Sequence, residues 1–195
     1  DAGEVTELLL KEQLVDGKFV NVTDIYGLTG MGTAAVSWAD YDCDGWVDLY
    51  LSGKVWHNDK GTQFTPVDGV ALPISVTVGD HDNDGWPDVA GWQEGSPNPP
   101  ELRRYDGAAK KWENQSSKFT GRPVYRSFAS AWGDFNNDGY LDFYQTGMTK
   151  DSAWPAAGTN DFIWFSDKAE SFELTWTSPA AGNTRAVTVS DFDRD

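Results

Sequence analysis

One acidic nine-residue pattern recurs along this chain and constrains its fold more than any other feature. The pattern reads D-x-[DN]-x-D-G-x-x-D, with oxygen-bearing side chains at positions 1, 3, 5 and 9. Complete copies occupy residues 40–48, 80–88 and 134–142, and an incomplete copy occupies residues 191–195. A short apolar run leads into each copy, so the repeating unit is a strand followed by an acidic loop.

The spacing of the acidic residues predicts a cation site in each loop. A hard divalent cation takes about six to eight oxygen ligands, and alternate residues of a tightly curled loop point inward. Glycine at position 6 permits the backbone reversal that turns the carbonyl of position 7 toward the cation. The predicted ligands are Asp40, Asp42, Asp44, Trp46 and Asp48 in the first copy; Asp80, Asp82, Asp84, Trp86 and Asp88 in the second; Asp134, Asn136, Asp138, Tyr140 and Asp142 in the third; and Asp191, Asp193 and Asp195 in the incomplete one.

Calcium is the expected ion, with three complete sites and a fourth partial one. Turn formation alone does not explain the repeated carboxylates, because their mutual repulsion is costly unless a cation neutralises it. Magnesium usually keeps several waters, so an all-protein cage favours calcium. Zinc is disfavoured because Cys43 and His81 stand at even positions, which are expected to point outward. The twelfth residues Leu51, Gly91 and Gln145 exclude an EF-hand, which ends in glutamate.

The residues on both sides of the loops predict short β-strands, because they are rich in small, β-branched and aromatic residues. Strands are expected before the loops at 35–38, 75–78, 128–132 and 186–189 and after them at 48–51, 88–92 and 142–145. Outer strands are expected at 19–22, 63–67, 111–114 and 172–176. Only residues 4–14 have a helical pattern, so the predicted class is all-β.

The strand–loop–strand unit resembles the FG-GAP/VCBS repeat family, and within it the cartilage acidic protein group. The resemblance is carried by residues 22–24, 27–32, 38–50 and 55–65, including the stretch from Trp38 through the first loop to Tyr50. It implies a β-propeller of four-stranded blades, usually seven, with a calcium ion at each blade that bears the motif. Because one such fold hosts many functions, the resemblance does not assign an activity.

The spacing of the loops predicts how many blades the chain holds. The loops begin 40, 54 and 57 residues apart, close to a blade length of about 40–50 residues. Residues 1–195 are therefore predicted to form a single partial propeller domain, with about three full blades and a partial blade at each end. A closed propeller has about four to eight blades, so we expect the chain to be part of a longer polypeptide. The excess spacing is expected in long loops at 95–100 and 151–160.

The charge of the chain excludes one class of partner. The formal net charge is −16, and fourteen of the 31 acidic residues lie in the four motifs. Such a chain repels nucleic acid and anionic membrane surfaces, and membrane insertion is not expected. The basic pairs Arg103–Arg104 and Lys110–Lys111 are expected at solvated strand ends.

The expected function is that of a secreted, calcium-binding recognition or adhesion module with a glycan or an extracellular protein as its ligand. Millimolar extracellular calcium keeps even weak loops filled, and His57 and His81 have no nucleophile arrangement around them, so no catalytic residue is assigned. Two alternatives stay open. One is the propeller portion of a secreted lyase or dehydratase that acts on sugars, and the other is a self-assembling subunit of an extracellular filament or matrix.

The aromatic residues fall into two groups by recurrence. Trp38 and Trp132, two residues before a loop, and the aromatic residues at position 7 recur and are expected in the core. The others do not recur and are better candidates for ligand contact: Trp92, Trp154 and Trp164.

Three polar positions carry predictions of covalent chemistry. Sequons at Asn21 and Asn114 permit N-glycosylation. The single cysteine, Cys43, either replaces asparagine in its loop or pairs with a cysteine elsewhere.

Overall fold

The computed structural model describes residues 11–13, 17–31, 35–51, 53–92, 100–121, 127–147, 160–179, 182 and 184–190. These residues form β-strands, and the one helical element among them is a 3₁₀ turn, η1, at Ser116–Lys118. The predicted all-β class is confirmed. Within the same residues, no helix is long and apolar enough to cross a membrane.

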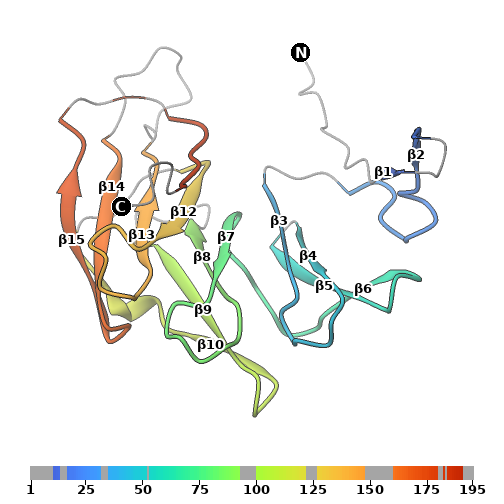
Figure 1. Ribbon diagram of the computed structural model, residues 1–195, viewed down its shortest axis with the longest axis horizontal. Helices are drawn as coiled ribbons and strands as arrows, with labels where there is room; N and C mark the ends of the chain where they lie inside the picture. The colour runs from blue at the N-terminus through green and yellow to red at the C-terminus, as the bar shows by residue number, and fades with distance from the viewer. Residues whose placement is uncertain are drawn as a thin grey trace.

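Three antiparallel sheets, A, B and C, follow one another along the chain (Figure 1). Sheet A contains β3 (Val36–Ala39), β4 (Asp48–Leu51), β5 (Lys54–Asn58) and β6 (Phe64–Pro66). Sheet B contains β7 (Ser75–Gly79), β8 (Asp88–Trp92), β9 (Glu101–Asp106) and β10 (Lys111–Asn114). Sheet C contains β12 (Ser130–Gly133), β13 (Asp142–Gln145), β14 (Phe162–Asp167) and β15 (Ser171–Thr177).

Two further pairings complete the strand list. The short β11 (Phe119–Thr120) adds to sheet C in parallel with β15. Strands β1 (Lys11–Gln13) and β2 (Phe19–Asn21) form a separate antiparallel pair. The strands predicted after the acidic loops and the predicted outer strands are confirmed.

The three sheets lie side by side through their first strands. Strand β7 contacts both β3 and β12, and each sheet then runs outward to its last strand in chain order. Three four-stranded antiparallel units in this arrangement are consistent with FG-GAP blades, and the described residues do not close into a ring (Figure 1).

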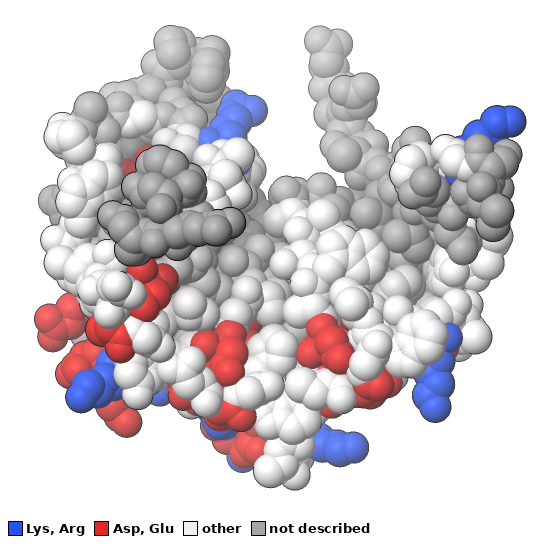
Figure 2. Space-filling model, in the orientation of Figure 1, with Lys and Arg blue, Asp and Glu red and all other residues white. Residues whose placement is uncertain are grey.

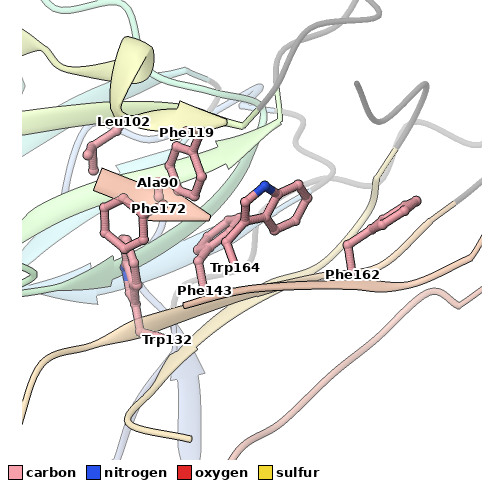
Figure 3. Packing of buried hydrophobic residues seen from close by; sticks show 8 residues of the cluster. All are labelled: Ala90, Leu102, Phe119, Trp132, Phe143, Phe162, Trp164 and Phe172. Atoms are coloured by element: carbon pink, nitrogen blue, oxygen red, sulfur yellow. The ribbon is translucent and has the colours of Figure 1, made fainter. Parts of the chain in front are cut away.

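Apolar side chains fill the space between neighbouring sheets. Between sheets B and C the core contains Ala90, Leu102, Phe119, Trp132, Phe143, Phe162, Trp164 and Phe172 (Figure 3). Between sheets A and B it contains Tyr41, Tyr50, Val55, Leu72, Val89 and Tyr105. Full burial of one such side chain contributes about 1.5–3 kcal/mol, so these two layers hold the sheets against each other.

A small residue at the end of each first strand lets the next sheet approach closely. A Cβ on Gly79 would lie 2.8 Å from Cδ1 of Trp132, which belongs to the following sheet. In the same way, a Cβ on Gly133 would lie 3.0 Å from Cγ1 of Val189. Residues 184–190 therefore lie where the first strand of a further sheet is expected. No strand is assigned to them, however, so the prediction of a strand at 186–189 is wrong.

Some predictions fall wholly or partly outside the described residues. The helical pattern at 4–14 is described only at 11–13, where the chain forms β1 instead of a helix. The long loops expected at 95–100 and 151–160 are described only at residues 100 and 160. The incomplete motif, with Asp191, Asp193 and Asp195, also lies outside the described residues.

Candidate metal centres

The three complete acidic loops, called loop 1 (40–48), loop 2 (80–88) and loop 3 (134–142), share one internal hydrogen-bond pattern. The carboxylate at position 1 accepts hydrogen bonds from the backbone N–H groups of positions 5 and 6, at 2.8–3.1 Å. The carboxylate at position 5 accepts one from the N–H of position 7, at 2.9 Å in every loop. These short-range contacts curl each loop, and in loops 1 and 2 they bring the side chains of positions 1, 3 and 5 together.

The backbone at positions 4 and 6 is left-handed in all three loops. The position-6 glycines Gly45, Gly85 and Gly139 have φ of 93°, 91° and 89°, values that other residues adopt only with strain. Position 4 has φ of 54° at Cys43, 59° at Asn83 and 58° at Asn137. Asparagine tolerates this region better than most residues, which accounts for its presence in two of the three loops.

The aspartates at position 9 are buried and join the loop to the third strand of its own sheet. In each loop, one carboxylate oxygen accepts the N–H of position 2. The other accepts an N–H from the third strand: from Asn58 to Asp48, from Tyr105 to Asp88 and from Ser166 to Asp142, at 2.8–2.9 Å. All three carboxylates are inaccessible to solvent. Burial raises the pKa of Asp88 and Asp142, and it raises the pKa of Asp48 to about 6.

Loops 1 and 2 each bring three carboxylates together with an unsatisfied oxygen. Ligand oxygens of positions 1, 3 and 5 lie within 4.8 Å of one another in both loops. The Oδ1 atoms of Asp42 and Asp82, at position 3, are buried, and neither has a hydrogen-bond partner within the described part of the chain. A buried oxygen of this kind is costly unless a donor or cation meets it. The residues present therefore fit a hard divalent cation with oxygen ligands.

Loop 3 differs from the other two at position 3, where it has an amide. Asn136 accepts a hydrogen bond from the N–H of Asp138 at 3.0 Å and donates its Nδ2 to Oδ2 of Asp138 at 3.1 Å. The amide oxygen is also a ligand type that calcium accepts. The predicted role of the position-7 carbonyls of Trp46, Trp86 and Tyr140 stays a prediction.

Neighbouring loops are linked to one another through position 4. The Nδ2 of Asn83 in loop 2 donates to the carbonyl of Gly139 in loop 3 at 3.0 Å. Cys43 occupies the same place in loop 1 and directs its Sγ to the carbonyl of Gly85 in loop 2, at 3.6 Å. Position 4 thus points away from its own carboxylates and toward the glycine of the next loop.

We expect Cys43→Asn to raise the free energy of unfolding by about 0.5–1 kcal/mol. An amide donor replaces a weak S–H donor, and asparagine is better suited to the left-handed backbone at this position. Chemical denaturation of both proteins under reducing conditions measures the difference. Asn83→Cys, which makes the reverse change in loop 2, is the matched control and is expected to destabilise by a similar amount; a stabilising effect of that variant would contradict the role given to position 4.

The structure corrects the outward orientation expected for His81 and shows where His57 lies. His81 does not point to solvent: it is completely buried, its Nδ1 lies 2.5 Å from Oδ2 of Asp88, and its ring packs against Trp132 and Phe172. His57 is three-quarters buried, and its Nδ1 lies 3.2 Å from Oδ1 of Asp48. The motif spacing carries no signal for His57, because it comes from the third strand of sheet A.

The structure also corrects the division of the aromatic residues. Trp92 and Trp164 were expected to be free for a ligand, but both are buried, and Trp164 has no exposed surface. Trp38 and Trp46 were expected in the core, yet each is 42% exposed. Trp132 is buried as expected, and Trp154 lies outside the described residues.

The comparison with protein families agrees with the loop geometry. Residues 80–144 match the FG-GAP-like repeat. The matched segment begins at the first aspartate of loop 2, contains loop 3 and spans about a third of the chain. This match supports the predicted FG-GAP/VCBS repeat family. No curated protein matches the chain.

Acidic side chains gather along one edge of the structure. Figure 2 shows Asp and Glu side chains along the lower part of the visible face, with Lys and Arg side chains beside them. Positions 1 and 5 of the loops are among the half-buried and exposed residues. The carboxylate clusters of the loops are therefore reachable from solvent.

Proposed function

We propose that this chain is the calcium-binding segment of an extracellular β-propeller and acts as a non-catalytic recognition or adhesion module. The observation that carries the proposal is the threefold recurrence of one loop geometry, with clustered carboxylates and an unsatisfied buried oxygen at position 3 of loops 1 and 2. The predicted ligand set is made of oxygen atoms, which favours calcium. An extracellular location supplies the millimolar calcium that such loops need.

The finer family assignment is part of the same proposal. The likeness of residues 38–50 and 55–65 to the cartilage acidic protein group supports a propeller of about seven blades, of which sheets A, B and C are three. The incomplete motif at 191–195 supports a calcium loop of a further blade.

Calcium is expected to raise the melting temperature of the protein by about 5 °C or more. Each filled site contributes about 1.4 kcal/mol when the free calcium concentration is ten times Kd. Thermal unfolding in calcium and in EDTA measures the shift, with magnesium at the same ionic strength as the control. Equal melting temperatures in calcium and EDTA would contradict the proposed metal function.

A cavity beside loop 1 is the best candidate for the ligand surface. It has a volume of about 430 Å³ and lies between sheets A and B. Its lining combines aromatic side chains with both signs of charge: Tyr41, Asp42, Val67, Asp68, Gly69, Val70, Tyr105, Lys110, Lys111 and Trp112. Aromatic rings next to polar groups suit the contact with a glycan or with a protein side chain.

The recognition role is tested with a glycan array and with a capture experiment on extracellular proteins, both in calcium and in EDTA. We expect retention in calcium, loss of retention in EDTA, and at least about tenfold weaker retention by Trp112→Ala. Trp46→Ala, which removes an aromatic side chain outside this cavity, is the matched control. Retention that is indifferent to EDTA and to Trp112→Ala would contradict the proposed surface.

A further inference from the structure

The third strand of each sheet presents a different residue to its acidic loop. In each sheet, a residue of the third strand donates its N–H to the position-9 carboxylate, and the residue directly before that donor is the one that differs. It is His57 in sheet A, Arg104 in sheet B and Phe165 in sheet C. The three loops share one geometry but differ in the side chain at this position of the third strand.

Arg104 is paired directly with two of the predicted metal ligands of loop 2. Its Nε donates to Oδ2 of Asp82 at 2.6 Å, and its Nη2 donates to Oδ2 of Asp84. Its Nη1 lies 3.9 Å from Glu113 on the adjacent strand β10. The guanidinium is 20% exposed, so Arg104 does not stand at a solvated strand end, as its sequence suggested. A planar fork with two charge-assisted hydrogen bonds is a strong and directional contact.

The corresponding residues of loops 1 and 3 make no such forked contact. His57 lies 3.7 Å from Oδ2 of Asp42, beyond hydrogen-bond distance, and Phe165 carries no donor in its side chain. Asp82 therefore accepts a charge-assisted hydrogen bond from this position of the third strand, and Asp42 does not.

We infer that Arg104 is the resident cation of loop 2, and that loop 2 binds calcium about tenfold or more weakly than loops 1 and 3. The inference rests on the proposed calcium function. Calcium in loop 2 has to displace the guanidinium from Asp82 and Asp84, or bind with a positive charge beside it. Either course reduces the net binding free energy. The same contact neutralises the loop 2 carboxylates when no metal is bound.

Calorimetric titration with calcium chloride tests this inference on the whole chain. Wild-type protein is expected to bind two calcium ions tightly and a third about tenfold or more weakly. Arg104→Met removes the charge and keeps the chain length, so the weak site is expected to tighten about tenfold or more. Adding Asp84→Asn to that variant is expected to abolish the gained site, which assigns it to loop 2. Lys54→Met removes an equal charge from the exposed first residue of strand β5 and is expected to change no site by more than about twofold.

Thermal unfolding in EDTA provides a second readout that does not depend on metal. Arg104→Met is expected to lower the melting temperature more than Lys54→Met does, because it leaves the carboxylates of loop 2 without the counter-charge of the guanidinium. Three sites of equal affinity in the wild type, unchanged by Arg104→Met, would overturn this inference and leave the proposed calcium function intact. If neither the wild type nor either single variant binds calcium, both this inference and the proposed calcium function are overturned.

Discussion

Asp142→Ala is expected to lower the free energy of unfolding by about 3–4 kcal/mol in EDTA. The carboxylate of Asp142 is completely buried and accepts hydrogen bonds from the N–H groups of Phe135 and Ser166 at 2.9 and 2.8 Å. Alanine leaves both donors without an acceptor, at about 1–3 kcal/mol each. Urea denaturation in EDTA measures the loss. In calcium the loss is expected to be larger, because Asp142 is also a predicted ligand.

Asp138→Ala is the matched control, since it changes the exposed position 5 of the same loop. In EDTA it is expected to cost less than about 1 kcal/mol, because the two hydrogen bonds that it removes come from the N–H of Tyr140 and the Nδ2 of Asn136, both at the surface of the loop. In calcium it is expected to remove the contribution of the loop 3 site. If Asp142→Ala lowered stability only when calcium is present, position 9 would be a metal ligand without a role in the metal-free fold.

Trp164→Ala is expected to destabilise the protein by about 4 kcal/mol and to lower its melting temperature by about 10 °C. Trp164 lies in the core between sheets B and C, against Phe119, Phe143 and Phe162 (Figure 3). Its Nε1 donates to the carbonyl of Thr120 at 2.9 Å, which adds to the pairing of β11 with β15. Alanine leaves a large cavity and removes this hydrogen bond. Differential scanning calorimetry in EDTA measures the change.

Trp46→Ala is the control for Trp164→Ala, because it removes a tryptophan that lies outside the core. Trp46 is 42% exposed and its ring lies on Gly61, in the turn between β5 and β6, so we expect a change within about 1 kcal/mol. A stable Trp164→Ala variant that lost retention on a glycan array would support the ligand-contact role suggested by its sequence position and contradict its place in the core.

The loops could be predicted well because their geometry is made by residues close together in the chain. The position-1 carboxylate binds N–H groups four and five residues ahead, and the position-5 carboxylate binds one two residues ahead. The φ values at positions 4 and 6 follow from residue type at the same positions. Spacing and composition therefore suffice to predict the curled loop and the strands on either side of it.

The partners of the loops could not be predicted, because they come from other strands. Arg104 is twenty or more residues from the carboxylates that it pairs with. His57 faces Asp48 only because β5 pairs with β4 in one register. A shift of that register by one residue would turn every side chain of the strand to the opposite face. The basic pair Arg103–Arg104 shows this directly, since Arg103 instead binds Glu101 and the carbonyl of Ala71.

Recurrence predicted the aromatic residues poorly for a similar reason. Trp38 and Trp132 occupy the same place in sheets A and C; Trp132 packs against the neighbouring sheet at Gly79, whereas the ring that Trp38 meets in the described part of the chain is Phe64 of its own sheet. Trp164 lies outside the acidic pattern, yet it is among the most completely buried side chains, and Trp56, which occupies the same place in sheet A, is buried as well. Burial depends on what lies beside a strand, and the repeat pattern describes only the strand itself.

The acidic repeat by itself determined the all-β class, the position of each loop and the oxygen-rich character of the candidate sites, because these depend on spacing within nine residues. Only the tertiary structure decided which loop carries a neighbouring guanidinium, which aspartates are buried as supports for the third strands, and which tryptophans fill the space between sheets. Those properties depend on strand register and on the packing of one sheet against the next, which join residues far apart in the chain.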